Sequence, residues 1–191
     1  KEDNLHPEPR SLIAITFISG GFSVILAIVL EQFTGNFVST NIEKYFVWAG
    51  VEEVVKYIAF VIVVLHSRYL DEPIDGIIYL ITVALGFAAI ENTMFILSPL
   101  GNGEIAKSIV MGSLRFIGSS LVHVVSSAFV GFIIGISFYK SNKVKILSTI
   151  FGIFVATILH ASFNLAIINS TSVSVLKVFS WVWCAVVVLI V

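Results

Sequence analysis

The sequence has little charge, a single cysteine and few prolines. Only 12% of its 191 residues are charged and 58% are hydrophobic, whereas a soluble domain has about 25% charged residues. The lone Cys184 excludes an intrachain disulfide and a zinc site built from cysteines. The formal net charge of −1 provides no basic surface for nucleic acid. With a mean hydropathy of +1.03, the chain is predicted to be an integral membrane protein.

Long apolar segments divide the chain into candidate membrane spans. A helix needs about 20 predominantly apolar residues to cross a bilayer, and only helices and closed barrels satisfy their backbone groups in lipid. About six segments qualify: residues 11–30, 45–65, 76–97, 108–139, 146–168 and 173–191. We therefore expect an all-α, polytopic transmembrane helical bundle that forms one domain over residues 1–191. Residues 1–10 are a polar lead-in, and we expect one more span upstream.

The second segment contains three ionisable residues in otherwise apolar sequence: Glu52, Glu53 and Lys56. Each costs at least about 2.5–3.5 kcal/mol at mid-membrane, so such groups face a protein interior or a wet cavity and mark functional sites. An internal ion pair between Glu52 and Lys56, which are four residues apart, is the structural alternative. That pair would leave Glu53 unexplained.

Polar residues in the later segments lie at a similar depth. At about 1.5 Å per residue, and with helices alternating in direction, they fall roughly 5–20 Å below one membrane face. Polar residues without a shared function would be spread over both halves of the bilayer. Because these residues lie in one half, we predict that they form a single site. Its candidate members outside the second segment are Glu91, Asn92, Arg115, His123, His160 and Asn164.

Lysine and arginine indicate the orientation of the bundle. One side collects six basic residues and the other collects three: Lys1, Arg10, Arg68, Lys140, Lys143 and Lys145 against Lys44, Lys107 and Lys177. Short cytoplasmic loops carry the excess of positive charge. The predicted site therefore lies in the non-cytoplasmic half of the cell membrane.

Two imidazoles and several carboxylates in one pocket suit two chemistries. They can hold a divalent metal with a spare glutamate as general base. Alternatively, a glutamate can activate water directly while His and Asn stabilise the oxyanion. Asn92 is expected to support the site by hydrogen bonding, and Arg115 to balance a carboxylate.

Short motifs recur in a fixed order along the chain. They are HPEPRS before the first span, EEVVK at 52–56, DGIIY at 75–79, GFAAIEN at 86–92 and HASFN at 160–164. In this order and spacing they resemble the PrsW-type intramembrane proteases, within the wider superfamily of CAAX prenyl endopeptidases and Abi proteins. That superfamily has EExxxR and FxxxH elements. Here Lys56 lies one residue closer than the arginine, and Glu91 replaces the histidine.

The resemblance implies an intramembrane endopeptidase that cleaves a single-pass membrane protein, such as an anti-sigma factor, in stress signalling. It implies that Glu52 or Glu53 activates the water. Glu91, His123 and His160 would bind a divalent metal, with zinc the expected ion, or stabilise the transition state. Asn164 would donate to the oxyanion or to a residue that supports the site.

Two other functions fit the same residues. A proton- or cation-coupled transporter would use the buried carboxylates and Lys56 as a relay. A non-catalytic membrane scaffold could share the fold. The one-sided cluster and the lack of an internal repeat argue against a transporter, because transporters often have inverted repeats around a midplane site.

Overall fold

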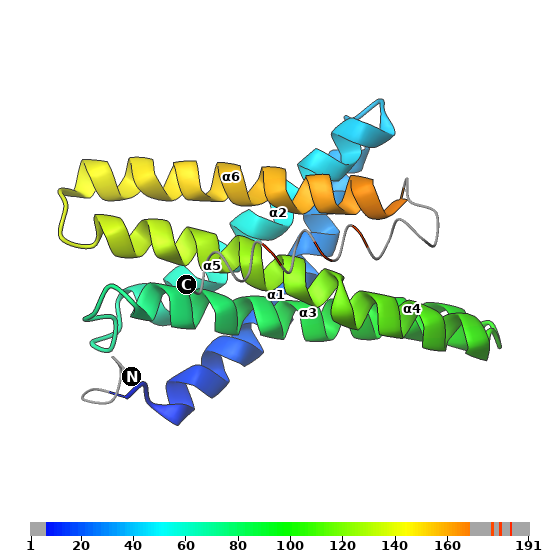
Figure 1. Ribbon diagram of the computed structural model, residues 1–191, viewed down its shortest axis with the longest axis horizontal. Helices are drawn as coiled ribbons and strands as arrows, with labels where there is room; N and C mark the ends of the chain where they lie inside the picture. The colour runs from blue at the N-terminus through cyan, green and yellow to red at the C-terminus, as the bar shows by residue number, and fades with distance from the viewer. Residues whose placement is uncertain (1–6, 169–176, 178–179, 181–183, 185–191) are drawn as a thin grey trace.

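The chain forms a bundle of helices (Figure 1). The computed structural model describes residues 7–168 together with Lys177, Ser180 and Cys184. Its elements are α1 (Arg10–Gly35), α2 (Asn41–Phe60), the π-helix η2 (Val61–Leu65), α3 (Asp75–Gly101), α4 (Ile105–Ile117), α5 (Ser119–Ser137) and α6 (Asn142–Ile168). The described part contains no strand. The prediction of an all-α polytopic bundle is thus confirmed.

Four of these helices are long and apolar enough to cross a membrane: α1, α3, α5 and α6. The expected number was about six. The second expected span forms the continuous helix α2–η2, but its three ionisable residues lower its apolar character. The sixth, 173–191, falls largely outside the described residues.

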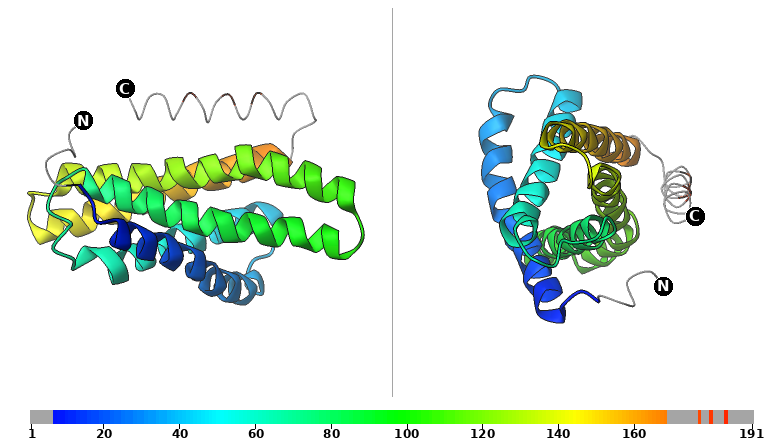
Figure 2. Two further views of the ribbon diagram at one scale, coloured as in Figure 1. Left: turned by 90° about the horizontal axis from the view of Figure 1, so that it is seen from below. Right: turned by 90° about the vertical axis from the view of Figure 1, so that its left-hand side faces the viewer.

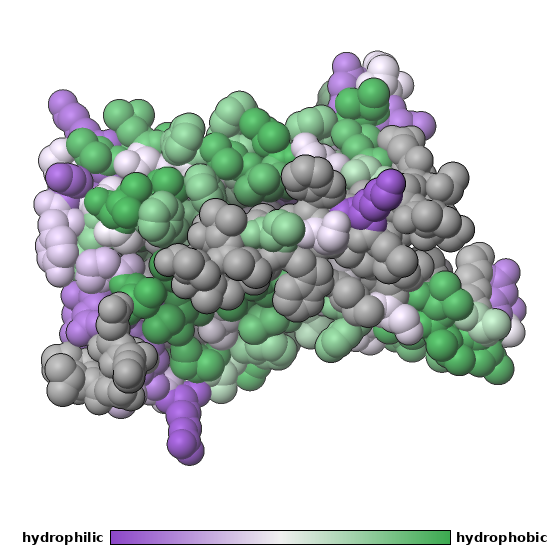
Figure 3. Space-filling view, in the orientation of Figure 1, coloured by the Kyte–Doolittle hydropathy of each residue, from purple (hydrophilic) through white to green (hydrophobic). Residues whose placement is uncertain are grey.

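The outer surface of the bundle is apolar. Large hydrophobic side chains such as Phe22, Ile62 and Phe154 are more than half exposed, at 68%, 76% and 61%. Figure 3 shows hydrophobic residues over the middle of one face and hydrophilic residues towards its ends. Such a large apolar surface is expected of a protein surrounded by lipid.

Five helices close into a ring. Neighbouring contacts run from α1 to α2, α2 to α6, α6 to α5, α5 to α3 and α3 back to α1, as the end-on view in Figure 2 shows. α3, α5 and α6 follow the long axis of the molecule, while α1 and α2 cross it at an angle (Figure 1). The inward faces of α2, α3, α5 and α6 therefore meet inside the ring.

Glycines bring α3 into backbone contact with α1. A Cβ atom built on Gly86 would lie 1.9 Å from the carbonyl oxygen of Phe17, and one on Gly20 would lie 2.1 Å from that of Val83. Small residues permit such close approach between membrane helices, where packing rather than hydrophobicity drives association. This contact fixes α3, and with it Glu91, relative to α1.

α2 has a defined start and a buried inner face. Thr40 and Glu43 form a capping box, in which the Thr40 hydroxyl accepts from the Glu43 amide at 3.3 Å and the Thr40 amide donates to the Glu43 carboxylate at 3.1 Å. This arrangement satisfies amides that the first helical turn leaves free. Glu52, Glu53 and Lys56 are all buried on the inner face.

Three expected boundaries were wrong. The long segment 108–139 is two helices, because the helical hydrogen-bond pattern is interrupted at Gly118 between α4 and α5, although Gly118 itself keeps αR backbone angles. The loop expected at 98–107 shrinks to Asn102–Glu104, since α3 continues through Pro99 and ends before Gly103, whose φ of +78° suits glycine. Glu31, expected in a loop, lies in α1.

Asp75, the first residue of α3, orders the loop before the helix. Its carboxylate accepts from the amides of Asp71 and Glu72 in that loop, at 3.0 and 2.6 Å. It therefore orders the connection that leads into α3. The hydroxyl of Tyr79, one turn further on, donates to Glu8 in the N-terminal lead-in.

The lysine-rich turn between α5 and α6 is predicted to be cytoplasmic, and the turn after α3 non-cytoplasmic. The test uses Cys184→Ser as background and adds Lys143→Cys or Asn102→Cys, both at exposed positions. An impermeant thiol reagent applied to intact cells should label Asn102→Cys only, because the positive loops stay inside. Labelling of Lys143→Cys but not Asn102→Cys would reverse the orientation.

Candidate active site

The buried cluster begins with an ion pair within α2. The Lys56 ammonium donates to Glu53 Oε1 at 2.5 Å, and Lys56 is fully buried. The expected pair was Glu52 with Lys56. The structure instead pairs residues three apart, which also share a helix face, because the Glu53 and Lys56 side chains both point to where α5 and α6 meet α2. Glu52 is thereby left without the lysine.

His160 reaches this pair from α6. Its Nδ1 lies 2.9 Å from Glu53 Oε1, and a carboxylate can only accept, so Nδ1 carries the ring proton. The opposite nitrogen, Nε2, then has its lone pair free of a proton. It faces Glu52 Oε2 at 3.7 Å.

His123 approaches from α5 in a related way. Its Nε2 lies 3.0 Å from Glu91 Oε2 on α3, and its Nδ1 lies 3.2 Å from Lys56 Nζ. The ammonium can only donate and the carboxylate can only accept, so the proton is on Nε2 and Nδ1 is the acceptor. Nδ1 is also 3.8 Å from Glu52 Oε2.

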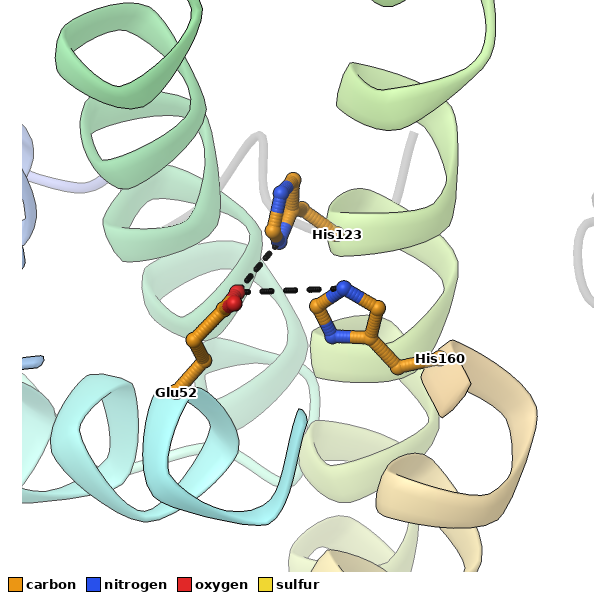
Figure 4. Close-up of side chains that lie close together, drawn as sticks. All are labelled: Glu52, His123 and His160. Carbon is orange, nitrogen blue, oxygen red and sulfur yellow. Dashed lines mark ion pairs between the residues drawn. The ribbon is translucent and has the colours of Figure 1, made fainter. Parts of the chain in front are cut away.

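Glu52 is the residue on which both imidazoles converge (Figure 4). The two rings are in edge-to-face contact, with centroids 4.7 Å apart. Glu52 Oε2 is buried and has no hydrogen-bond partner among the residues that the structure describes. A buried acceptor without a partner is costly and calls for an explanation, such as a catalytic role or an ion.

The structure thus brings six of the predicted residues into one cluster: Glu52, Glu53, Lys56, Glu91, His123 and His160. The supporting residues differ. Asn92 donates to Ser120 at 2.9 Å, which ties α3 to α5 beside the cluster. Asn164 is half-buried one turn beyond His160, and no hydrogen bond between it and the described cluster is present. The side chain of Arg115 lies outside the part described.

Sequence reasoning missed Glu31. Its carboxyl group lies near enough to Glu52 to interact with it electrostatically, and its backbone carbonyl accepts from Trp48 Nε1 at 3.2 Å. The predicted first span stops at residue 30, so the sequence pattern places Glu31 in the loop that follows. Continuing that helix by one more turn would have placed a fourth glutamate at the depth of the site.

The cluster fits a divalent metal. One donor atom each from Glu52, His123 and His160 lie within 4.8 Å of one another. Two imidazole nitrogens and a carboxylate form a known zinc-binding set. Each imidazole is held through its other nitrogen by a carboxylate, Glu53 or Glu91, as is usual for metal-bound histidines. The geometry favours Glu52 over Glu91 as the third donor.

Comparison with known proteins agrees with this chemistry. A family model described as "PrsW family intramembrane metalloprotease" matches residues 8–191. A protein named Protease PrsW from Clostridioides difficile (strain 630) is 31% identical over 170 residues, which are 85% of this chain and 70% of that protein. Its namesake from Geobacillus kaustophilus (strain HTA426) is 29% identical over 146 residues, 74% of this chain and 61% of that protein.

A further relative named Protease PrsW, from Bacillus subtilis (strain 168), is 28% identical over 113 residues, 59% of this chain and 48% of that protein. No solved structure matches the chain. The family model covers most of the sequence, including every residue of the cluster. The chain therefore belongs to the PrsW family of intramembrane metalloproteases.

Proposed function

We propose that this chain cleaves a membrane-anchored protein within the bilayer, with the Glu52–His123–His160 cluster activating the attacking water. The observation that carries the proposal is the Glu52 carboxylate. Its Oε2 is buried without a hydrogen bond and faces the imidazoles of two other helices. A structural carboxylate would be satisfied by donors, whereas this one is left able to accept from water or to hold a cation.

The two adjacent glutamates have different tasks in this proposal. Glu53 Oε1 already accepts from Lys56 at 2.5 Å and from His160 at 2.9 Å. An oxygen so occupied is a poor proton acceptor, so Glu53 positions His160. Glu52 acts on the water in one of two ways: it helps to hold the metal that acidifies the water, or, with no metal involved, its lone pair receives the proton as a general base.

Glu52, His123 Nδ1 and His160 Nε2 would hold the metal. When bound, a divalent ion such as zinc polarises the scissile carbonyl and acidifies water. The chain's own residues orient the site: Glu53 holds the ring of His160, and Glu91 holds the ring of His123. Asn164 is proposed to donate to the developing oxyanion, since it follows His160 by one turn.

The proposed substrate is a single-pass membrane protein of the anti-sigma-factor type. The motif order shared with PrsW-type proteases supports it, as does the bilayer location of the cluster. The same motifs support a distant relation to the CAAX and Abi proteins. The excess of lysine and arginine on the opposite loops supports a site in the non-cytoplasmic half.

Metal analysis combined with a cleavage assay tests the proposal. The purified chain should contain about one divalent ion per molecule, as expected for a single three-residue protein site. It should cut a reconstituted single-pass substrate, lose that activity with a chelator and regain it with zinc. Full activity in the presence of the chelator would show that cleavage does not need a metal. Proton flux through proteoliposomes without cleavage would favour the transporter.

A further inference from the structure

One ligand atom of the cluster is already occupied by a cation. An imidazole nitrogen that carries no proton has a single lone pair. In His123 that lone pair, on Nδ1, accepts from Lys56 Nζ at 3.2 Å, and the other nitrogen is committed to Glu91 at 3.0 Å. His123 therefore has no lone pair left for a metal while this arrangement lasts.

The other two donors of the cluster differ from His123. His160 Nε2 faces the Glu52 carboxylate at 3.7 Å, not a cation. Glu52 Oε2 has no hydrogen-bond partner. Two of the three donors thus point to the centre of the cluster with accessible lone pairs, and the third is capped by an ammonium group.

We propose that Lys56 and a divalent metal compete for His123 Nδ1, so that Lys56 sets how tightly the site is loaded. A metal binds imidazole about 2.0–2.1 Å from the nitrogen, along the same lone pair, so both cannot bind at once. The proposal rests on the proposed function, because it assumes that Glu52, His123 and His160 hold the metal.

Lys56 can release His123 without leaving the site. Its ammonium keeps Glu53 at 2.5 Å and lies over the ring of Phe87, 5.3 Å from the centroid. Both contacts stabilise a cation. While no ion is bound, Lys56 balances part of the carboxylate charge, which would otherwise be buried and unpaired at high cost. Loading the site then requires only that the Lys56–His123 hydrogen bond opens.

The test compares metal affinity in wild type and in Lys56→Met. Methionine has similar length and no donor, so it removes the competitor from Nδ1. Metal-free full-length protein is titrated with Zn²⁺ against a competing chelator, and with Co²⁺, whose visible absorption reports coordination. Lys56→Met should bind both ions roughly ten- to hundredfold more tightly, the range of a charge-assisted hydrogen bond.

Lys44→Met is the matched control. It makes the same substitution in the first turn of the same helix, where Lys44 lies over Trp48 at 4.7 Å, and it should leave metal affinity unchanged. If Lys56→Met binds the metal no more tightly than the wild type, the competition is overturned. The proposed function still stands in that case, provided that the wild type binds the metal. Absence of metal binding in both proteins overturns both.

If Lys56→Met does not fold, a measurement on the wild-type protein still tests the competition. Nitrogen NMR of labelled histidine and lysine should show His123 Nδ1 unprotonated and hydrogen-bonded in the metal-free protein. Saturating Zn²⁺ should shift the Lys56 Nζ signal and that of Nδ1 together. A Lys56 signal that stays unchanged while Nδ1 binds the ion would overturn the inference.

Discussion

Glu52→Gln is expected to abolish cleavage while the folded protein stays abundant. Glutamine keeps the shape of the side chain but removes the charge that accepts a proton or holds a cation. Loss of a general base typically costs about 10²–10⁴-fold. If Glu52 holds the metal instead, the variant loses a ligand of the ion that acidifies the water. Because Glu52 Oε2 has no hydrogen bond to lose, little stability should be lost. A cleavage assay on matched amounts of purified protein provides the measurement.

Glu53→Gln serves as the neighbouring comparison. Glu53 is paired with Lys56 inside the bundle, so its neutralisation leaves a buried ammonium without its counter-ion. Breaking one partner of a buried pair typically costs about 3–5 kcal/mol. We expect Glu53→Gln to lose folded protein as well as activity. Normal cleavage by both variants would make the carboxylates structural, or parts of a relay, and would end the protease assignment of this cluster.

Gly86→Ala is expected to prevent the assembly of the bundle. The added Cβ would lie 1.9 Å from the backbone oxygen of Phe17, and a backbone atom of a packed helix cannot move aside as a side chain can. α1 and α3 would have to separate, at more than the roughly 1–3 kcal/mol of ordinary overpacking. The yield of detergent-extracted monodisperse protein and its melting temperature should both fall sharply.

The control for this substitution is Gly101→Ala. A Cβ at Gly101 would meet nothing within 4 Å, and alanine is a better helix former than glycine. Gly101→Ala should therefore match or slightly exceed the wild-type melting temperature. If Gly86→Ala has the same yield and melting temperature as the wild type, the helices α1 and α3 do not pack as closely as described above.

Much of the fold follows from the apolar segments alone. Their lengths place α1, α3 and α6 to within a few residues, because each contains a largely apolar run of spanning length. The depth of Glu91, His123 and His160 along alternating helices was enough to predict that they meet. That argument needs only the rise per residue, which is nearly constant in a helix.

The details of the site needed three-dimensional information. Glu52 and Glu53 are adjacent in sequence, and only the rotation of α2 about its axis decides that Glu53 takes Lys56. The break at Gly118 was missed because no proline marks it, and a glycine alone is common inside membrane helices. Glu31 was missed because hydropathy does not report where a helix ends. The catalytic roles of the cluster remain predictions for the experiments above.

The charge content of α2 also bears on how the protein enters the membrane. Each ionisable residue at the centre of a span costs about 2.5–3.5 kcal/mol during insertion by the translocon. The Glu53–Lys56 pair forms within α2 itself, but the second partner of Glu53, His160, is synthesised 107 residues later. We therefore predict that α2 becomes stable in the bilayer only after the helices that complete the cluster have been synthesised.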